Sequence, residues 1–272
     1  VCSSDLDAPY ENMGTIQTKG WELAIDYRHT FKNGLHFGVT ASVADDKTEV
    51  TKWTYNTKIP SYGATGWWDK SAYKEGMVLG DIWGLQFDRF LTEDDFNADG
   101  SLKAGLPDQT KVFPAGYQFA PGDVLYKDLD NNGEIVKQTN TNDKGDLSVI
   151  GNALPRLQFG LNLDAAWKGF DISMFFQGVA KRKLWAAGNQ VLPGFTTGEP
   201  FYKGAEDYWT PENTDAFYPR PMDYKQSASG NYSVNDRYLL NMAYLRLKTF
   251  TVGYSLPKVW LSKFKVQGLR VY

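Results

Sequence analysis

The segment 156–178, RLQFGLNLDAAWKGFDISMFFQG, separates into an apolar and a polar set when its residues are taken alternately. Before Lys168-Gly169 the apolar residues stand at odd positions: Phe159, Leu161, Leu163, Ala165 and Trp167. After this pair they stand at even positions: Phe170, Ile172, Met174 and Phe176, with Phe175 as the one exception. Because side chains alternate across a β-strand, the pattern predicts two strands joined by a tight turn, with one apolar and one polar face.

The length of these two strands indicates what covers their apolar face. Strands of soluble sandwiches usually have ~5–6 residues, whereas a tilted strand that spans a bilayer needs ~9–11. The runs 157–168 and 170–179 fall in the longer class. Their length therefore favours lipid over a second sheet as the neighbour of the apolar side chains.

A second hairpin of the same kind is predicted over residues 20–28 and 35–46. Its two alternating runs flank Asn33-Gly34, a dipeptide that favours a two-residue turn. The parity of the apolar residues slips around Lys248, which indicates either a bulge or a strand that leaves the membrane there. Further strands are predicted at 80–87, 237–256 and 264–272.

Two long irregular segments, 47–156 and 180–236, separate the predicted strands. Loops of this length are uncommon in compact domains unless they are functional. Short turns at one end of the strands and long loops at the other are typical of outer-membrane barrels. The sequence therefore predicts an all-β fold, a segment of an antiparallel transmembrane β-barrel with long extracellular loops.

The composition excludes several other classes of protein. The chain of 272 residues has a net charge of −3 and no basic cluster, so we expect no binding to nucleic acid. It contains no run of about 18 apolar residues, the length that would predict a transmembrane helix. An aromatic content of 15% with a mean hydropathy of −0.45 fits a barrel that has a polar lumen and long loops.

The first six residues, Val1–Leu6, are predicted to be foreign to the protein. The sequence VCSSDL back-translates to the end of a common sequencing adapter, so we interpret it as an assembly artefact. Cys2 is the single cysteine of the chain, which excludes an internal disulfide, and we assign it no function. Residues 7–272 show no internal domain boundary, and we interpret them as part of one barrel.

Several segments resemble, in their order along the chain, the C-terminal part of SusC/RagA-type TonB-dependent outer-membrane transporters. They are NMGTIQTKGWELAIDY, EGMVLGDIWGLQ, GDVLYKDLDNNGEI, VIGNALPRLQFGLNL, WKGFDISMFFQG, DYWTPENTDAFYPR and AYLRLKTFTVGYSLP. The resemblance implies a large barrel of about 22 strands with an N-terminal plug domain inside. On this interpretation the chain is a C-terminal barrel fragment, truncated at both ends and without the plug.

The resemblance also implies a function, the uptake of nutrients across the outer membrane of a Gram-negative bacterium. The cargo of such transporters is an oligosaccharide or a peptide, a SusD-like surface lipoprotein caps the barrel, and the TonB-ExbB-ExbD complex acts through the missing N-terminal part. The alternative from another class is a soluble, secreted, β-rich glycan-binding module, which would bury the alternating faces in a second sheet. An enzyme is the third option, and no motif supports it.

The motif Asp128-Leu-Asp130-Asn-Asn132-Gly-Glu134 resembles the first half of a calcium-binding loop. Oxygen ligands at alternate positions could converge on Ca²⁺, whereas the twelfth position holds Thr139 instead of a bidentate glutamate. The site would therefore be incomplete unless Asp143 or Asp146 folds back. The alternative is a turn in which these side chains bond their own backbone.

Aromatic residues in the long loops are candidates for contact with the cargo or a partner, because rings pack on sugars and anchor proteins. Tyr208 and Trp209 could instead pack the base of their loop. The full candidate set is Trp67, Trp68, Trp185, Tyr208 and Trp209.

The strand pattern assigns two further sets of residues. Asn162, Asp164, Thr249 and Thr251 are predicted to face the lumen. Trp167, Phe170, Phe250 and Tyr254 are predicted to face lipid.

No catalytic residues are predicted. His29 and His36 flank one turn without a third metal ligand nearby, and the chain has no nucleophile elbow, phosphate-binding loop or zinc spacing. Carboxylates are plentiful, but no pair stands out as a glycosidase site.

Overall fold

The structure is a computed structural model that describes residues 14–54, 75–137, 144–195, 201–222, 230–263 and 265–272. The chain forms two compact units. The sheet unit contains Thr18–Lys47, Ala153–Leu184 and Leu240–Tyr272, and the loop unit contains Thr48–Asn152 and Trp185–Leu239 together with the first residues. Across the described ranges, no helix has the length and apolar character needed to cross a membrane. The foreign segment predicted at Val1–Leu6 lies outside the described residues.

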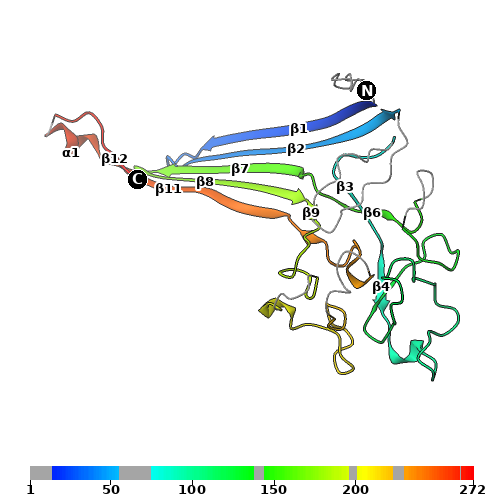
Figure 1. Ribbon diagram of the computed structural model, residues 1–272. Coiled ribbons are helices and arrows are strands. Elements are labelled where there is room, and N and C mark those ends of the chain that lie inside the picture. The colour runs from blue at the N-terminus through cyan, green and yellow to red at the C-terminus, as the bar shows by residue number, and fades with distance from the viewer. Residues whose placement is uncertain (1–13, 55–74, 138–143, 196–200, 223–229, 264) are drawn as a thin grey trace, which may run out of the picture. The chain divides into compact units, whose positions relative to one another are not determined.

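The sheet unit is built on a six-stranded sheet with the order β1-β2-β7-β8-β11-β12 (Figure 1). Each strand pair for which a register is defined is antiparallel. The prediction of an all-β, antiparallel fold is thus confirmed. The strands are β1 (Gly14–Thr30), β2 (His36–Trp53), β7 (Arg156–Trp167), β8 (Phe170–Lys181), β11 (Tyr244–Ser255) and β12 (Arg270–Val271).

The turn between β7 and β8 is as tight as the sequence predicts. Trp167 pairs directly with Phe170, so only Lys168 and Gly169 connect the strands. Their φ angles are 49° and 89°, and positive φ at both central residues is the geometry of the favoured two-residue hairpin turn. Glycine adopts such an angle without steric cost, which explains its place here.

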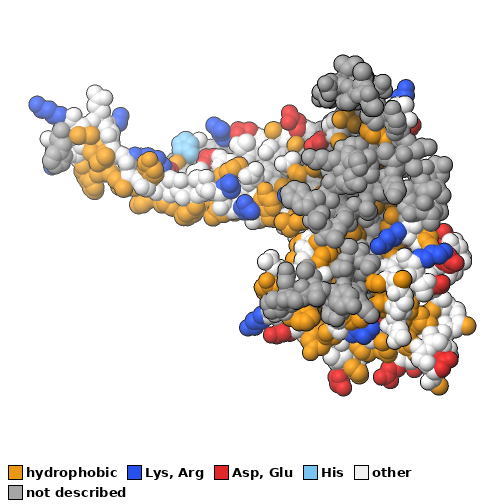
Figure 2. Space-filling model, viewed as in Figure 1, with side chains coloured by type: hydrophobic (Ala, Val, Ile, Leu, Met, Phe, Trp, Pro, Cys, Tyr) orange, Lys and Arg blue, Asp and Glu red, His pale blue; other side chains and the backbone are white. Residues whose placement is uncertain are grey.

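One face of the sheet carries apolar side chains and the other carries polar ones, as rows of residues paired across neighbouring strands show. One row joins Val39, Leu163, Met174 and Phe250 across β2, β7, β8 and β11. A neighbouring row on the opposite face joins Asp164, Ser173 and Thr251. Figure 2 shows hydrophobic side chains gathered along one side of these strands.

The slip of parity in β11 is a bulge, which confirms the first of the two predicted explanations. Leu247 pairs with Phe176 and Phe250 pairs with Met174, while the register shifts between Leu247 and Thr249. Lys248 is therefore the extra residue, and the apolar side chains before and after it stay on one face.

The loop unit contains short strands in pairs: β3 (Asp81–Gly84) with β6 (Ser148–Asn152), and β4 (Phe87–Phe90) with β5 (Val124–Tyr126). The run predicted at 80–87 is thus divided between β3 and β4. The unit has its own hydrophobic core, and this core can form because long-range pairs bring distant segments together. Its buried members include Leu85, Phe90, Val124, Tyr126, Ile135 and Trp209.

The prediction of a strand over 264–272 is wrong for most of that segment. Among the described residues 265–272, only Arg270–Val271 form a strand, β12, and the short helix α1 (Lys258–Ser262) precedes it. Pro257 is the N-cap of this helix, with φ −59°, and the fixed φ of proline is tolerated where a helix begins. The predicted strand 237–256 also begins later, because β10 (Leu240–Asn241) pairs with β9 (Lys183–Leu184) before β11 starts.

Candidate functional site

A pocket in the loop unit is lined by tyrosine, phenylalanine and proline side chains. Its volume is about 400 Å³, within the range of small-ligand sites. It contains one of the aromatic residues proposed from the sequence, Tyr208. The apolar part of the lining consists of Phe201, Tyr202, Tyr208, Tyr218 and Tyr232 with Pro193, Pro219, Pro221 and Ala205.

Tyr208 and Tyr218 are positioned by a short parallel bridge between their segments. The N–H of Trp209 donates to the carbonyl of Tyr218 at 3.0 Å, and the N–H of Tyr218 donates to the carbonyl of Asp207 at 2.9 Å. Because both bonds are made by the backbone, the geometry of this wall does not depend on the phenol rings.

The segment between them, DYWTPENTDAFY, closes on itself through Asp207. One carboxylate oxygen of Asp207 accepts the N–H of Phe217 at 3.1 Å, and the other accepts the side-chain amide of Asn213 at 3.2 Å. The amide of Asn213 also donates to the carbonyl of Tyr208 at 3.2 Å. These bonds give Asp207 and Asn213 a structural role, because their side chains hold the motif in its closed form.

The floor of the pocket is a cluster of tyrosines. Tyr232 is 1% exposed, and its ring lies edge-on to Tyr238 at 5.3 Å. Tyr218 stacks on the same Tyr238 ring at 6.1 Å. Burial raises the pKa of Tyr232, and burial together with the charge of Asp207 raises the pKa of Tyr218. Both phenols therefore stay protonated and neutral at physiological pH.

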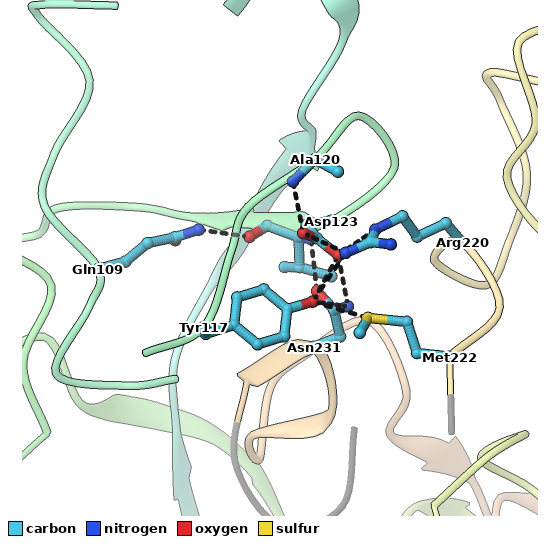
Figure 3. A network of polar contacts seen from close by, with 8 residues as sticks. Gln109, Tyr117, Ala120, Asp123, Arg220, Met222 and Asn231 are labelled. Carbon is cyan, nitrogen blue, oxygen red and sulfur yellow. Dashed lines mark hydrogen bonds and ion pairs between the residues drawn. The ribbon is translucent and has the colours of Figure 1, made fainter. Parts of the chain in front are cut away.

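A buried ion pair fixes the wall that carries Pro219 and Pro221 (Figure 3). Arg220, the residue between these prolines, donates to Asp123 at 2.9 and 3.2 Å, and the carboxylate of Asp123 is fully buried. The hydroxyl of Tyr117 and the amide of Asn231 also donate to Asp123, at 2.8 and 2.9 Å. Burial and the adjacent Asp123 charge raise the pKa of Tyr117, so its hydroxyl remains a donor.

The structure corrects part of the aromatic candidate set. Trp209 is 6% exposed and belongs to the core, where a β-carbon on Gly122 would lie 2.5 Å from its ring. Trp185 is 2% exposed. Both indoles are enclosed by protein, so neither is placed to touch cargo or a partner. Trp67 and Trp68 lie outside the described residues.

The acidic turn gathers three carboxylates, Asp128, Asp130 and Asp146. Each offers one oxygen, and these three oxygens lie within 4.8 Å of one another. Asp146 thus folds back toward the turn, as the sequence allows. Desolvation and the nearby charge of Asp146 raise the pKa of Asp130. Three hard oxygen donors of this kind are ligands that Ca²⁺ accepts.

Glu134 is not one of these three carboxylates, and the side chain of Asn132 is bonded within the turn. The Asn132 side chain accepts the N–H of Glu134 at 2.8 Å and donates to Asp130 at 3.0 Å. Glu134 forms an ion pair with Lys111. Asp130 accepts the N–H of Asn132 at 3.1 Å, so side chains of the turn bond its own backbone, and the calcium site stays a prediction.

The two predicted strand sets lie on opposite faces of the sheet. Asn162 is paired through Phe175 to Thr249, and Asp164 through Ser173 to Thr251. On the other face Trp167 is paired through Phe170 to Tyr254, and Phe250 pairs with Met174. The assignment of these faces to lumen and lipid stays a prediction.

Sequence reasoning missed most of the pocket. Phe201, Tyr202 and Tyr218 received no assignment, and the Asp123–Arg220 pair was not anticipated. Asp123 and Arg220 are 97 residues apart, so no local spacing connects them. A usable signal was the density of aromatic and proline residues in 201–222.

Comparisons with known proteins show two curated relatives that match nearly the whole chain. TonB-dependent receptor P3 of Formosa agariphila is 25% identical over 99% of the chain, and TonB-dependent receptor P26 of the same organism is 25% identical over 98%. The resemblance to TonB-dependent receptors is thus confirmed. The chain covers 24% and 25% of the length of these two receptors, so it spans about a quarter of each. No family model matches the chain.

Solved structures share the fold of this chain. The chain aligns with the RagAB peptide transporter with a TM-score of 0.64, at 16% identity, over 96% of the chain and 25% of that protein. The RagAB peptide importer in its closed-closed state aligns with a TM-score of 0.59 at 15% identity over the same shares. At this identity the likeness supports the fold, a segment of a transporter barrel with its loops.

Proposed function

We propose that the chain is part of a longer TonB-dependent importer in the outer membrane of a Gram-negative bacterium. The observation that carries the proposal is the sheet unit, in which long antiparallel strands present one apolar and one polar face. Such a sheet suits a barrel wall between lipid and a polar lumen. The similarity to TonB-dependent receptors over nearly the whole chain supports the same function.

The proposed cargo is an oligosaccharide or a peptide, and the loop unit is the part of this chain that would meet it. This unit has a core of its own and an open pocket. Loops held on a rigid scaffold are the usual place for binding residues. We propose a SusD-like surface lipoprotein as a partner, and the TonB-ExbB-ExbD complex as the source of energy through segments outside this chain.

A non-enzymatic role is supported by the relatives, which are named receptors. The alternative of a soluble glycan-binding module requires a second layer over the apolar face. On that face the side chains of Phe170 and Phe250 are 60% and 58% exposed. Lipid would cover them in the proposed barrel.

Membrane fractionation tests the importer against the soluble module. The protein, expressed from its own genomic locus, should stay in the outer-membrane pellet after washing with alkaline carbonate. Deletion of the gene should abolish growth on one class of oligosaccharide or peptide while growth on glucose is unchanged. Release of the protein by the alkaline wash would reject the barrel and favour the soluble module.

We also propose that Asp128, Asp130 and Asp146 hold a Ca²⁺ ion that stabilises the acidic turn. Ion binding would relieve the repulsion of three clustered carboxylates. Millimolar Ca²⁺ should slow proteolysis of the loop unit in the full-length protein, and Asp130→Asn should remove this protection. Glu134→Gln, a change outside the group, is the control. Equal rates of proteolysis with Ca²⁺ and with a chelator would reject the calcium site, and the segment would then be a turn whose side chains bond its backbone.

A further inference from the structure

Three turns lie together at one end of the sheet unit, and contacts between them fix this arrangement (Figure 1). The indole N–H of Trp167, at the end of β7, donates to the carbonyl of Asn33 in the turn between β1 and β2 at 3.3 Å. The N–H of Ser255, at the end of β11, donates to the carbonyl of Gly169 in the turn between β7 and β8 at 2.8 Å. Helix α1 lies in the connection from β11 to β12 at the same end.

This turn end of the sheet is cationic. Residues 27–38, 165–170 and 256–272 contain no aspartate or glutamate. The nearby carboxylate of Asp171 on β8 is already paired, because Arg270 donates to both of its oxygens at 2.5 and 3.0 Å. The lysines of the three turns are exposed and form no ion pair within the described part of the chain: Lys32, Lys168, Lys258, Lys263 and Lys265.

Exposed apolar side chains accompany these lysines (Figure 2). The ammonium of Lys168 lies 4.4 Å from the centre of the Trp167 ring. In α1 the side chain of Leu261 is buried and anchors the helix, whereas Val259 and Trp260 are 74% and 59% exposed. Tryptophan rings next to lysines whose amines reach water suit the headgroup region of a membrane.

A shallow hollow on the apolar face adjoins Lys168. Its volume is about 160 Å³, and its lining consists of Leu35, Ala165, Ala166, Trp167, Phe170, Asp171, Ile172 and Val252. Ala165 pairs with Ile172, and Trp167 pairs with Phe170 one step closer to the turn. The short side chain of Ala165 thus leaves space between larger apolar neighbours, and this space accepts part of a hydrocarbon chain.

We propose that the turn end of the sheet binds an anionic phospholipid, with one acyl chain in the hollow and the phosphate beside Lys168. The lysines of the α1 connection attract further anionic headgroups, as basic residues at a membrane surface do. A zwitterionic phospholipid has the same phosphate and chains, but its ammonium group is repelled by these lysines. The inference rests on the proposed membrane location and adds to it a lipid site with a preference for anionic headgroups.

The test uses the full-length transporter purified in detergent and native mass spectrometry, which counts bound lipids. Phosphatidylglycerol should bind about tenfold or more tightly than phosphatidylcholine with the same acyl chains. The variant Lys168→Gln, Lys258→Gln, Lys263→Gln should lose this preference. The control variant Lys52→Gln, Lys127→Gln, Lys144→Gln removes the same charge from exposed positions of the loop unit and should keep it.

A second pair of variants tests the hollow. Ala165→Phe fills it and should lower the number of tightly bound phosphatidylglycerol molecules by about one. Ala41→Phe places the same ring elsewhere on the apolar face, where Ala41 pairs with Leu161, and should leave this number unchanged. Both variants add apolar surface on the face that is proposed to meet lipid, so both are expected to fold.

Four results would overturn the inference. They are equal affinity for the two lipids, a preference that the first lysine variant keeps, an equal loss of preference in the control lysine variant, and unchanged lipid binding by Ala165→Phe. A dimer of the transporter that the first lysine variant dissolves would assign this end to a second copy of the chain and would also overturn it. Each result leaves import open, since membrane fractionation and growth of the deletion strain decide that separately.

Discussion

Phe175 breaks the alternation of β8 because of a glycine on the neighbouring strand. Its side chain lies on the polar face, where a β-carbon on Gly160 would be 3.5 Å from the ring. The other face carries the converse pair, since a β-carbon on Gly178 would lie 2.3 Å from the ring of Phe159. In both pairs an aromatic ring packs over the backbone of a glycine on the neighbouring strand. This contact stabilises the strands. The exception in the sequence pattern is thus a cross-strand contact.

Asp95 gives the loop unit a dependence on pH. Arg89 donates to both of its carboxylate oxygens, at 2.6 and 2.7 Å, and this bonding lowers the pKa of Asp95 to about 2. A carboxyl whose folded pKa lies below its unfolded value stabilises the fold above the unfolded pKa of 3.8 and loses this contribution as pH falls toward 2. The contribution is roughly 1–2 kcal/mol.

We therefore expect proteolysis of the loop unit by pepsin to accelerate as the pH falls from 4 to 2. Asp95→Asn should be cleaved faster than the unaltered protein at pH 4, and the two rates should converge near pH 2. Asp94→Asn, a change at the adjacent exposed position, is the control and should follow the unaltered protein throughout. If the ratio of the cleavage rate of Asp95→Asn to that of the unaltered protein stays constant over this pH range, Asp95 is not the source of the pH dependence.

At the scale of the element, the two faces of β7 predict opposite outcomes for one substitution. Leu163 lies near the middle of this strand on the apolar face, and Asn162 lies beside it on the polar face. Leu163→Arg should destabilise the assembled barrel by ~2–4 kcal/mol if the residue sits at mid-bilayer, whereas Asn162→Arg should have little effect. The fraction of full-length protein that migrates as the folded form in unheated SDS gels measures this. Equal assembly of both variants would reject the lipid assignment.

The bulge in β11 predicts which deletions the strand tolerates. Removal of Lys248 takes out the extra residue and leaves Leu247 and Phe250 on the apolar face. Removal of Val252 moves one apolar ring to the polar face. This ring is Phe250 if the residues before the deletion shift, and Tyr254 if the residues after it shift. The deletion of Lys248 should assemble in the outer membrane, and that of Val252 should be lost to periplasmic proteases, as immunoblots of membrane fractions would show.

At the scale of the molecule, the sheet unit was the predictable part. Its strands satisfy a local rule, alternation, and the short turns at Asn33-Gly34 and Lys168-Gly169 are read directly from the residues. The pairs β3 with β6 and β4 with β5 were not foreseen, because their strands have three to five residues and their partners lie far away in the chain. Alternation over so few positions carries no signal.

The candidate pocket was predictable only at Tyr208. Local sequence does not distinguish this exposed tyrosine from the adjacent Trp209, which is buried in the core. The difference arises from Gly122, whose missing side chain makes room for the indole. Gly122 is almost 90 positions away from Trp209, so the burial of Trp209 cannot be predicted from the residues around it.

The isolated chain of 272 residues is expected to aggregate. Strand β1 has 17 residues and lies at one end of the strand order, so it forms an edge of the described sheet. Long, exposed edges recruit further strands. Sedimentation after refolding in buffer should show large oligomers, whereas a monodisperse species would indicate that the edge is covered.

The order of the strands has a consequence for how such proteins diversify. Neighbours β2 and β7 are separated by residues 54–155, and neighbours β8 and β11 by residues 182–243. Each long segment thus leaves and re-enters the sheet at adjacent strands, and lengthening a loop costs little closure entropy. Duplication, loss or exchange of either insertion between related genes would preserve the pairing of the wall. Related proteins could in this way acquire new recognition surfaces by exchanging whole loop segments while the sheet stays unchanged.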